Sequence, residues 1–146
     1  MPTTSAPKKK NSVLIQYGIG RRGVPGANSL RKWAALVPLE ATLRIVGVHE
    51  GRRLNRTFRG KDYATNVLSF QYGKDKGDVV LCHPVVAREA RAQGKKLAAH
   101  YAHLVLHGLL HLRGYRHEKK REAERMERAE IRLLARAGFG NPYTVE

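Results

Sequence analysis

The segment 97–112 constrains the fold most strongly, because it is almost continuously apolar and yet carries histidines at a regular spacing. This composition predicts a helix over Leu97–Leu112. His107 and His111 are four residues apart, so a helix places both imidazoles on one face. Gly114 follows and can take the left-handed conformation that ends a helix. The chain can then fold back and bring His117 to the same point.

The spacing H-x-x-x-H-x-x-G-x-x-H predicts a metal site. Three nitrogen ligands with a fourth position left to water are typical of catalytic zinc, whereas structural zinc is closed by four protein ligands. A histidine on a helix is more often structural, so the pair alone would be weak evidence, and the third histidine favours the metal. His103 is an alternative third ligand, but His103, His107 and His111 would span about 12 Å of helix, too far for one ion. We therefore predict one zinc ion bound by His107, His111 and His117.

Length and composition predict one globular domain. The chain has 146 residues, of which 42% are hydrophobic, enough to bury a core. Its single cysteine, Cys82, follows the apolar run Val79–Leu81, and we interpret it as a small buried hydrophobe in a reducing compartment. Without a membrane-spanning run or a secretory signal, a cytoplasmic protein is the simplest expectation. We expect residues 1–11 to be a disordered basic tail and residues 12–146 to form one domain.

The charge indicates a polyanionic partner. Lysine and arginine number 28 against 12 acidic residues, which gives a formal net charge of +16. Such a field attracts nucleic acid, the commonest cytoplasmic polyanion. A membrane surface and a basic surface without a specific partner are rival interpretations. Because no basic amphipathic anchor is evident, we favour nucleic acid and expect no membrane association.

The remaining patterns predict short strands alternating with helices. We expect strands at Val13–Tyr17, Thr42–Val48, Val67–Phe70 and Asp78–Cys82. We expect helices at Leu30–Val37 with Ser29 as its cap, at Glu50–Phe58, from Pro84 to about Gln93, at Leu97–Leu112, and from about Glu118 to Ala137. This mixture predicts an α+β domain.

A glycine motif near the N-terminus has a competing interpretation. Gly18, Gly20 and Gly23 follow a predicted strand and fit the pattern G-x-G-x-x-G of dinucleotide sites. However, the residues Val24–Gly26 replace the helix that such a site needs, and no ribose-binding acid is evident. We therefore interpret this segment as a flexible loop.

The residue after the first histidine argues against a peptidase. Zinc peptidases of the H-E-x-x-H type have a glutamate there as general base, and this chain has Gly108, although the remaining spacing resembles that of metzincins. Hydrolysis without that base is more plausible when the substrate is anionic and cationic side chains of the protein bind it. Arg56, Arg59 and Lys61 offer such cations, and arginine can clamp a phosphate through paired hydrogen bonds.

Several long segments resemble one family. They are RGKDYATNVLSF (Arg59–Phe70), GDVVLC (Gly77–Cys82), HLVLHGLLHLRGYRH (His103–His117) and NPY (Asn141–Tyr143). Together they resemble the YbeY family, bacterial metal-dependent endoribonucleases of ribosomal RNA maturation and ribosome quality control. The resemblance runs from about Leu43 to Tyr143.

The resemblance implies an architecture and a site. The expected fold is α+β, a YbeY-like catalytic domain with a small mixed four-stranded sheet, about five helices and a metzincin-like metal-binding helix. It implies zinc on His107, His111 and His117, with Arg59 as the cationic catalytic residue. The implied substrate is single-stranded RNA near the 3′ end of 16S ribosomal RNA. Implied partners are small-subunit ribosomal proteins and a ribosome-associated GTPase.

Three departures from the family pattern stand out. Family members usually have aspartate where this chain has Arg116, beside a predicted ligand, where the charge change could alter metal affinity or add a phosphate contact. They often have proline at the position of Ala64. They also have a longer, partly acidic insertion where this chain has QYGKDKG, residues 71–77.

Our leading hypothesis is a zinc-dependent endoribonuclease in which Arg59 stabilises charge on the phosphate, with Arg56, Lys61 and Arg116 as further substrate contacts. Either a metal hydroxide or the RNA 2′-hydroxyl could attack. The main alternative is a non-catalytic RNA-binding ribosome-assembly factor whose metal is structural. A zinc hydrolase for another anionic substrate is a third hypothesis.

Overall fold

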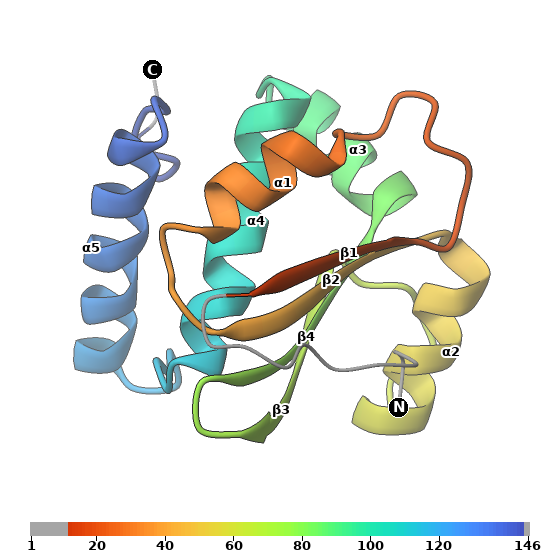
Figure 1. The fold of residues 1–146 in the computed structure, drawn as a ribbon, viewed down its shortest axis with the longest axis horizontal. Helices are drawn as coiled ribbons and strands as arrows, with labels where there is room; N and C mark the ends of the chain where they lie inside the picture. The colour runs from red at the N-terminus through yellow and green to blue at the C-terminus, as the bar shows by residue number, and fades with distance from the viewer. Residues whose placement is uncertain (1–11, 145–146) are drawn as a thin grey trace.

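The computed structural model describes residues 12–144 (Figure 1). The predicted basic tail, residues 1–11, lies outside the described residues. The elements follow one another in the order β1 (Val13–Tyr17), α1 (Ala27–Ala34), β2 (Glu40–Val46), α2 (Val48–Arg59), β3 (Val67–Gly73), β4 (Lys76–Cys82), α3 (His83–Ala92), α4 (Leu97–Leu112) and α5 (Lys120–Arg136). Among the described residues, no helix combines the length and the apolar character needed to cross a bilayer.

The four strands form one mixed sheet in the order β1-β2-β4-β3. β2 lies between β1 and β4 and is parallel to both, while β3 is the antiparallel edge strand beside β4. Parallel neighbours require crossover connections, which α1 supplies between β1 and β2. A tight turn containing Asp75, at φ 55°, joins β3 to β4. The prediction of an α+β domain with a small mixed sheet and five helices is confirmed.

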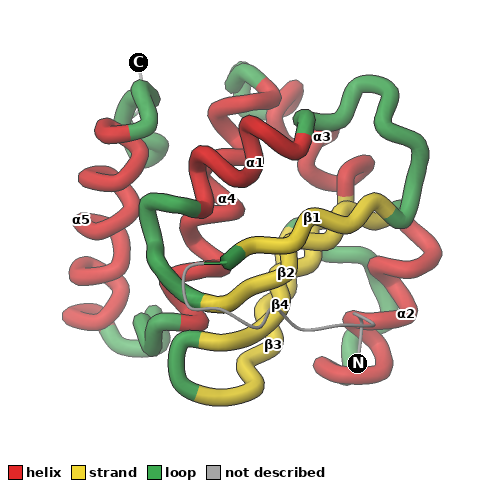
Figure 2. Tube along the Cα trace, in the orientation of Figure 1, coloured by secondary structure: helices red, strands yellow, loops and turns green. Residues whose placement is uncertain are grey.

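Helices cover both faces of the sheet (Figure 2). Side chains alternate along each strand, so Ile45 and Val79 enter the larger core, which the sheet shares with α1, α4 and α5. Val80 faces the opposite way and packs with Leu54 of α2 in a second, smaller core. Cys82 belongs to this smaller core and is 2% exposed, as predicted for a small buried residue.

The helix α4 is the central element of the larger core. Tyr101, Leu106 and Leu109 are each 0% exposed, and burial on all sides is what a helix of this composition requires. Two glycines allow its close approach to the sheet. A Cβ at Gly108 would lie 2.6 Å from Val79 Cγ1, and one at Gly77 of β4 would lie 2.7 Å from a methyl group of Leu112 on α4.

Several predicted boundaries are wrong by two or three residues. The helix α1 begins at Ala27 after an extended Gly26, so Ser29 lies inside the first turn and does not cap the helix. The strand β2 ends at Val46, because its pairing with β4 ends there and Gly47 is already the N-cap of α2. The last helix begins at Lys120 instead of Glu118. The glycine-rich segment 18–26 is a loop, as predicted.

Candidate metal centre

The end of α4 brings the three predicted ligands together. His107 and His111 lie on the last two turns of the helix, and Gly114 has φ 98°. The backbone N–H of Tyr115 donates to Leu110 O at 3.0 Å, and that of Gly114 donates to His111 O at 3.0 Å. These two bonds define a Schellman motif, which reverses the chain. The reversal places His117 beside the helix.

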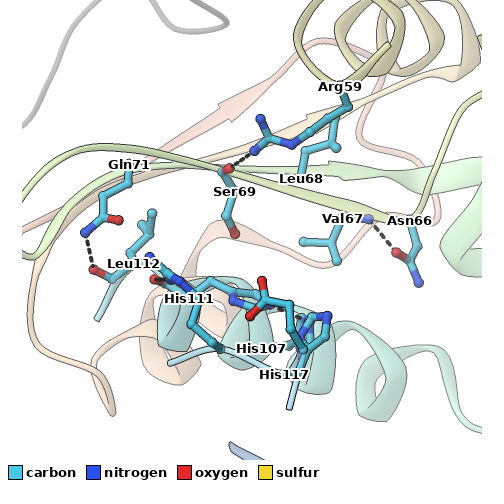
Figure 3. A pocket seen from close by; sticks show the side chains of 12 residues that line it. Arg59, Asn66, Val67, Leu68, Ser69, Gln71, His107, His111, Leu112 and His117 are labelled. Atoms are coloured by element: carbon cyan, nitrogen blue, oxygen red, sulfur yellow. Dashed lines mark hydrogen bonds between the residues drawn. The ribbon is translucent and has the colours of Figure 1, made fainter. Parts of the chain in front are cut away.

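The three imidazoles converge closely enough to share one ion (Figure 3). The Nε2 atoms of His107 and His111 are 3.2 Å apart. One ring nitrogen from each of His107, His111 and His117 lies within 4.8 Å of the others. Zn–N bonds of 2.0–2.1 Å at tetrahedral angles separate two ligand nitrogens by about 3.3 Å. The donor set and its spacing therefore fit zinc, and the assignment of these residues as its ligands stays a prediction.

Hydrogen bonds on the far side of two rings fix which nitrogen faces the centre. His107 Nδ1 lies 2.9 Å from Glu130 Oε2, and His111 Nδ1 lies 2.9 Å from Tyr115 O. A carboxylate and a carbonyl are both acceptors, so each Nδ1 must carry the proton and donate it. In the neutral form of each ring, the lone pair is then on Nε2, which is the nitrogen that faces the centre and the form that a metal ligand needs.

The surroundings also shift the pKa values of two groups at the centre, His111 and Glu130. Burial, reinforced by the neighbouring His107, lowers the pKa of His111 to about 4, although its hydrogen bond to Tyr115 works in the opposite direction. His111 is therefore neutral at physiological pH. Burial alone would raise the pKa of Glu130, but hydrogen bonds from His103, His107 and a tyrosine outweigh it and hold that pKa at about 2.

The histidines lie in a cavity of about 510 Å³. Its lining comes from the end of α2, the segment before β3, β3 itself, α4 and the turn after α4. The lining residues are Arg59, Asn66, Val67, Leu68, Ser69, Gln71, His107, His111, Leu112, Arg116, His117 and Glu118. Figure 3 shows the labelled β3 residues above the imidazoles, with Arg59 on the far side of the strand. The cavity thus combines a possible metal site with polar and cationic side chains.

Contacts with β3 hold Arg59 at the rim of this cavity. It is the last residue of α2, and Gly60 follows in the left-handed conformation. One guanidinium N–H donates to Ser69 O at 2.6 Å, and the guanidinium carbon lies 5.1 Å from the centroid of the Phe70 ring. The side chain remains exposed, so it can still meet an anionic ligand. Its catalytic role stays a prediction.

The other three predicted substrate contacts lie in different places. Arg116 lines the cavity, and its NH1 donates to Tyr115 O at 3.2 Å and to His111 O at 3.4 Å. Arg56 and Lys61 do not line it. Arg56 instead lies 3.6 Å from the carboxylate of Asp62. The structure thus brings only Arg116 to the histidines, and contacts of the other two with a longer RNA stay predictions.

Sequence reasoning missed the residues that support the ligands. Glu130 and Tyr143 lie beyond the helix that carries the histidines, and Ser69 lies on β3. One signal was present for Glu130: it is an acidic residue on the apolar face of α5, between Met126 and Leu134, and it is 1% exposed. An acid on an inward-facing stripe requires buried partners.

Comparisons with known proteins give long matches to one family. The sequence model of the family described as Endoribonuclease YbeY matches residues 27–138. Among curated proteins named Endoribonuclease YbeY, that of Aromatoleum aromaticum is 50% identical, over 96% of this chain and 97% of its own. That of Bordetella pertussis is 49% identical, over 90% of this chain and 95% of its own.

The fold has a solved counterpart as well. The solution structure of a Thermotoga maritima protein aligns with a TM-score of 0.60 over 92% of this chain and all of its own, at 22% identity. At that identity the likeness concerns the fold alone. The sequence matches, by contrast, are long and cover almost the full length of both partners. This chain belongs to the YbeY family.

Proposed function

We propose that this protein is a zinc-dependent endoribonuclease that cleaves single-stranded RNA. The observation that carries the proposal is the convergence of three imidazoles in one cavity whose rim holds an exposed arginine. Its relatives bear the name Endoribonuclease YbeY, which supports the class of reaction. The net charge of +16 supports a polyanionic substrate.

His107, His111 and His117 would hold the ion. When bound there, zinc supplies a nucleophile at neutral pH or a Lewis acid for a phosphoryl oxygen. The protein's own contribution is to orient His107 and His111 so that Nε2 of each ring is directed at the shared point. Because the position after His107 is Gly108, α4 offers no carboxylate of the kind that serves as base in zinc peptidases.

Arg59 would bind and orient the scissile phosphate. Its bond to Ser69 O and its packing on Phe70 fix the plane of the guanidinium, while its exposure leaves N–H groups for a ligand. A fixed guanidinium can donate two parallel hydrogen bonds to phosphate oxygens. It also stabilises the negative charge that these oxygens gain as the phosphodiester reacts.

We further propose a role in ribosome biogenesis. The substrate would be the 3′ end of 16S ribosomal RNA, and the partners would be small-subunit ribosomal proteins and a ribosome-associated GTPase in the cytoplasm. Membership of the YbeY family supports this placement. The basic surface also suits a substrate that is an extended polyanion.

A non-catalytic RNA-binding factor with a structural metal is the alternative, and Arg116 is the observation that favours it. Its guanidinium is held against the carbonyls of His111 and Tyr115, next to the predicted ion. A fixed positive charge there can bind a phosphate of RNA whether or not the ion takes part in cleavage, which is what a binding factor needs.

The proposal is tested by metal content and RNA cleavage measured together. Purified wild type should contain one zinc per chain by plasma mass spectrometry and should cleave single-stranded ribosomal RNA. We expect His117→Ala and Arg59→Ala to abolish cleavage. His49→Ala and Arg53→Ala are matched controls, since both residues are exposed on α2 and outside the cavity.

The two candidate functions give different results. Loss of cleavage with retained RNA binding after zinc removal supports the enzyme. Equal cleavage by wild type, His117→Ala and Arg59→Ala would show that a contaminating nuclease acts. Stoichiometric zinc with no cleavage at all would favour the binding factor.

A further inference from the structure

A carboxylate is buried directly behind the metal centre. Glu130 of α5 is 1% exposed. Its Oε2 lies 2.9 Å from His107 Nδ1 and 2.9 Å from His103 Nε2. Its Oε1 accepts a hydrogen bond from the hydroxyl of Tyr143 at 2.5 Å. This carboxylate therefore joins α4, α5 and the C-terminal segment at a single point.

Glu130 has no permanently charged cationic partner in the part of the chain that the structure describes. Among the described residues, its ion-pair partners are His103 and His107, and neither lysine nor arginine approaches it as one. An ionised carboxylate in the interior is costly unless hydrogen bonds and an opposite charge compensate it. Three donors satisfy its hydrogen bonds. A cation on the other nitrogen of His107 would supply the opposite charge across one imidazole.

The same residues form a second group that could hold an ion, His103, His107 and Glu130, but the contacts favour hydrogen bonds. The distance of 2.9 Å between His107 Nδ1 and Glu130 Oε2 is shorter than the about 3.3 Å that separates two ligand atoms of tetrahedral zinc. A neutral imidazole also has only one free lone pair. If His107 Nε2 faces His111, then Nδ1 carries the proton and donates to Glu130.

We propose that Glu130 is the positioning residue of the metal centre, and that Tyr143 and His103 hold its carboxylate in place. Its oxygen fixes the ring plane and the tautomer of His107, and its negative charge makes His107 Nε2 a stronger donor to a cation. This inference rests on the proposed function, because it requires that His107 binds zinc. His111 has the same arrangement with the neutral carbonyl of Tyr115, so the two ligands differ in the charge behind them.

The C-terminal segment is part of this arrangement. The backbone N–H of Tyr143 donates to Asn141 Oδ1 at 2.8 Å, and Lys95 Nζ donates to Pro142 O at 3.2 Å. These bonds hold the segment against the protein. They bring the Tyr143 ring to an edge-on contact with His103, at 5.4 Å between ring centroids. The residues Asn141–Tyr143 thus act on the metal centre through Glu130, without contacting the ligand nitrogens.

Glu130→Gln tests the proposal, because glutamine keeps the size and an acceptor and removes the charge. We expect zinc affinity, measured by competition with a chromophoric chelator, to fall by about 10- to 100-fold. In the metal-free protein, long-range proton–nitrogen spectra should show the Nδ1–H tautomer of His107 in wild type and a mixture in Glu130→Gln. Glu124→Gln is the matched control: it removes the same charge from an exposed position of α5 that lines neither pocket beside the histidines, and it should leave affinity within about twofold.

A second variant guards against loss of folding in Glu130→Gln. Tyr143→Phe removes one of three donors from an exposed position and should weaken zinc binding by about three- to tenfold, while Tyr63→Phe, another exposed tyrosine, should not. Equal zinc affinity in wild type, Glu130→Gln and Tyr143→Phe overturns the inference and leaves the proposed function standing. If wild type binds no zinc, both the proposed function and this inference are wrong.

Discussion

Gly108 lies so close to Val79 that the helix carrying the histidines has no room for a side chain at that point. A Cβ there would be 2.6 Å from Val79 Cγ1 and 3.2 Å from Ser69 Oγ. The same Ser69 hydroxyl donates to Gly108 O at 3.0 Å. The glycine that excludes a peptidase-type base is therefore also the residue that seats the helix on the sheet.

Gly108→Ala should destabilise the protein. Alanine gains about 1 kcal/mol of helix propensity over glycine, but overpacking a close helix–sheet contact costs about 1–3 kcal/mol. We expect a net decrease in the free energy of unfolding, measured as a lower urea midpoint. Gly140→Ala is the control, since nothing lies within 4 Å of a Cβ at Gly140. A higher midpoint for Gly108→Ala would contradict a close contact between Gly108 and Val79.

Arg59→Lys should lose most of the cleavage activity although it keeps the charge. Lysine cannot both bond to Ser69 O and present a planar pair of donors to a phosphate. We expect a decrease in kcat of about 10²-fold or more, the usual effect of removing a donor to a developing oxyanion. Single-turnover cleavage of a short single-stranded RNA measures it. Full activity in Arg59→Lys would show that the positive charge of Arg59 is sufficient and that its paired donors are not needed.

Zinc should stabilise the folded protein through His117. A ligand that binds only the native state adds about 2.7 kcal/mol at a free concentration 100 times its Kd. Thermal unfolding with and without added zinc should show this increase in wild type and in His49→Ala. His117→Ala should lose most of it. An equal increase in Tm for all three proteins would place the ion elsewhere.

Low pH should destabilise the metal-free protein in part through His100. Burial lowers the pKa of His100, and the Glu89 carboxylate at 2.9 Å offsets only part of the effect. The unfolded chain, with a histidine pKa of about 6.5, then binds more protons than the folded one. The stabilising contribution is complete above about pH 6.5 and is lost as the pH falls below it.

Urea midpoints measured in a chelator at about pH 7.5, 6.5 and 5.5 test this contribution. We expect a flatter pH profile for His100→Asn, because asparagine can still donate to Glu89 and does not titrate. An unchanged slope in His100→Asn would show that other groups account for the whole pH dependence.

Arg116→Asp should raise the affinity for metal and lower the affinity for RNA. It replaces a cation beside His111 with an acid. We expect zinc to bind several-fold more tightly and RNA to bind more weakly, with a log K against log salt slope smaller by about one. Chelator competition and fluorescence anisotropy measure the two effects. Arg121→Asp, an exposed change on α5, should leave zinc affinity unchanged.

The sequence was most informative where the structure is local. The helix Leu97–Leu112 was predicted with its observed bounds, because its apolar composition and Gly114 define both its length and its end. The start of α1 was missed, because Ser29 is a good cap residue but Gly26 takes the extended conformation instead. Local sequence preferences were sufficient for the helix Leu97–Leu112. At the start of α1, two residues could act as the cap, and the sequence did not show which one would.

Contacts between distant segments were out of reach of local patterns. The bond from Arg59 to Ser69 O depends on the antiparallel placement of β3 beside β4. The bond from His107 to Glu130 depends on how α5 packs on α4. The periodicity of α5 indicates which face is buried, but it does not indicate which residue of another helix that face meets. The sequence could therefore indicate three candidate ligands, whose role stays a prediction, but it could not indicate the residues that contact them.

The Schellman turn at Gly114 also has a consequence for the order of folding. All three imidazoles come from the segment His107–His117 and are brought together by one turn of backbone. Closing so short a loop costs little chain entropy, so the ligand triplet can form early. Arg59, Glu130 and Tyr143 join it only after long-range contacts have formed, which are the slow part of folding. A partly folded chain can therefore bring the three imidazoles together before the rest of the cavity forms around them.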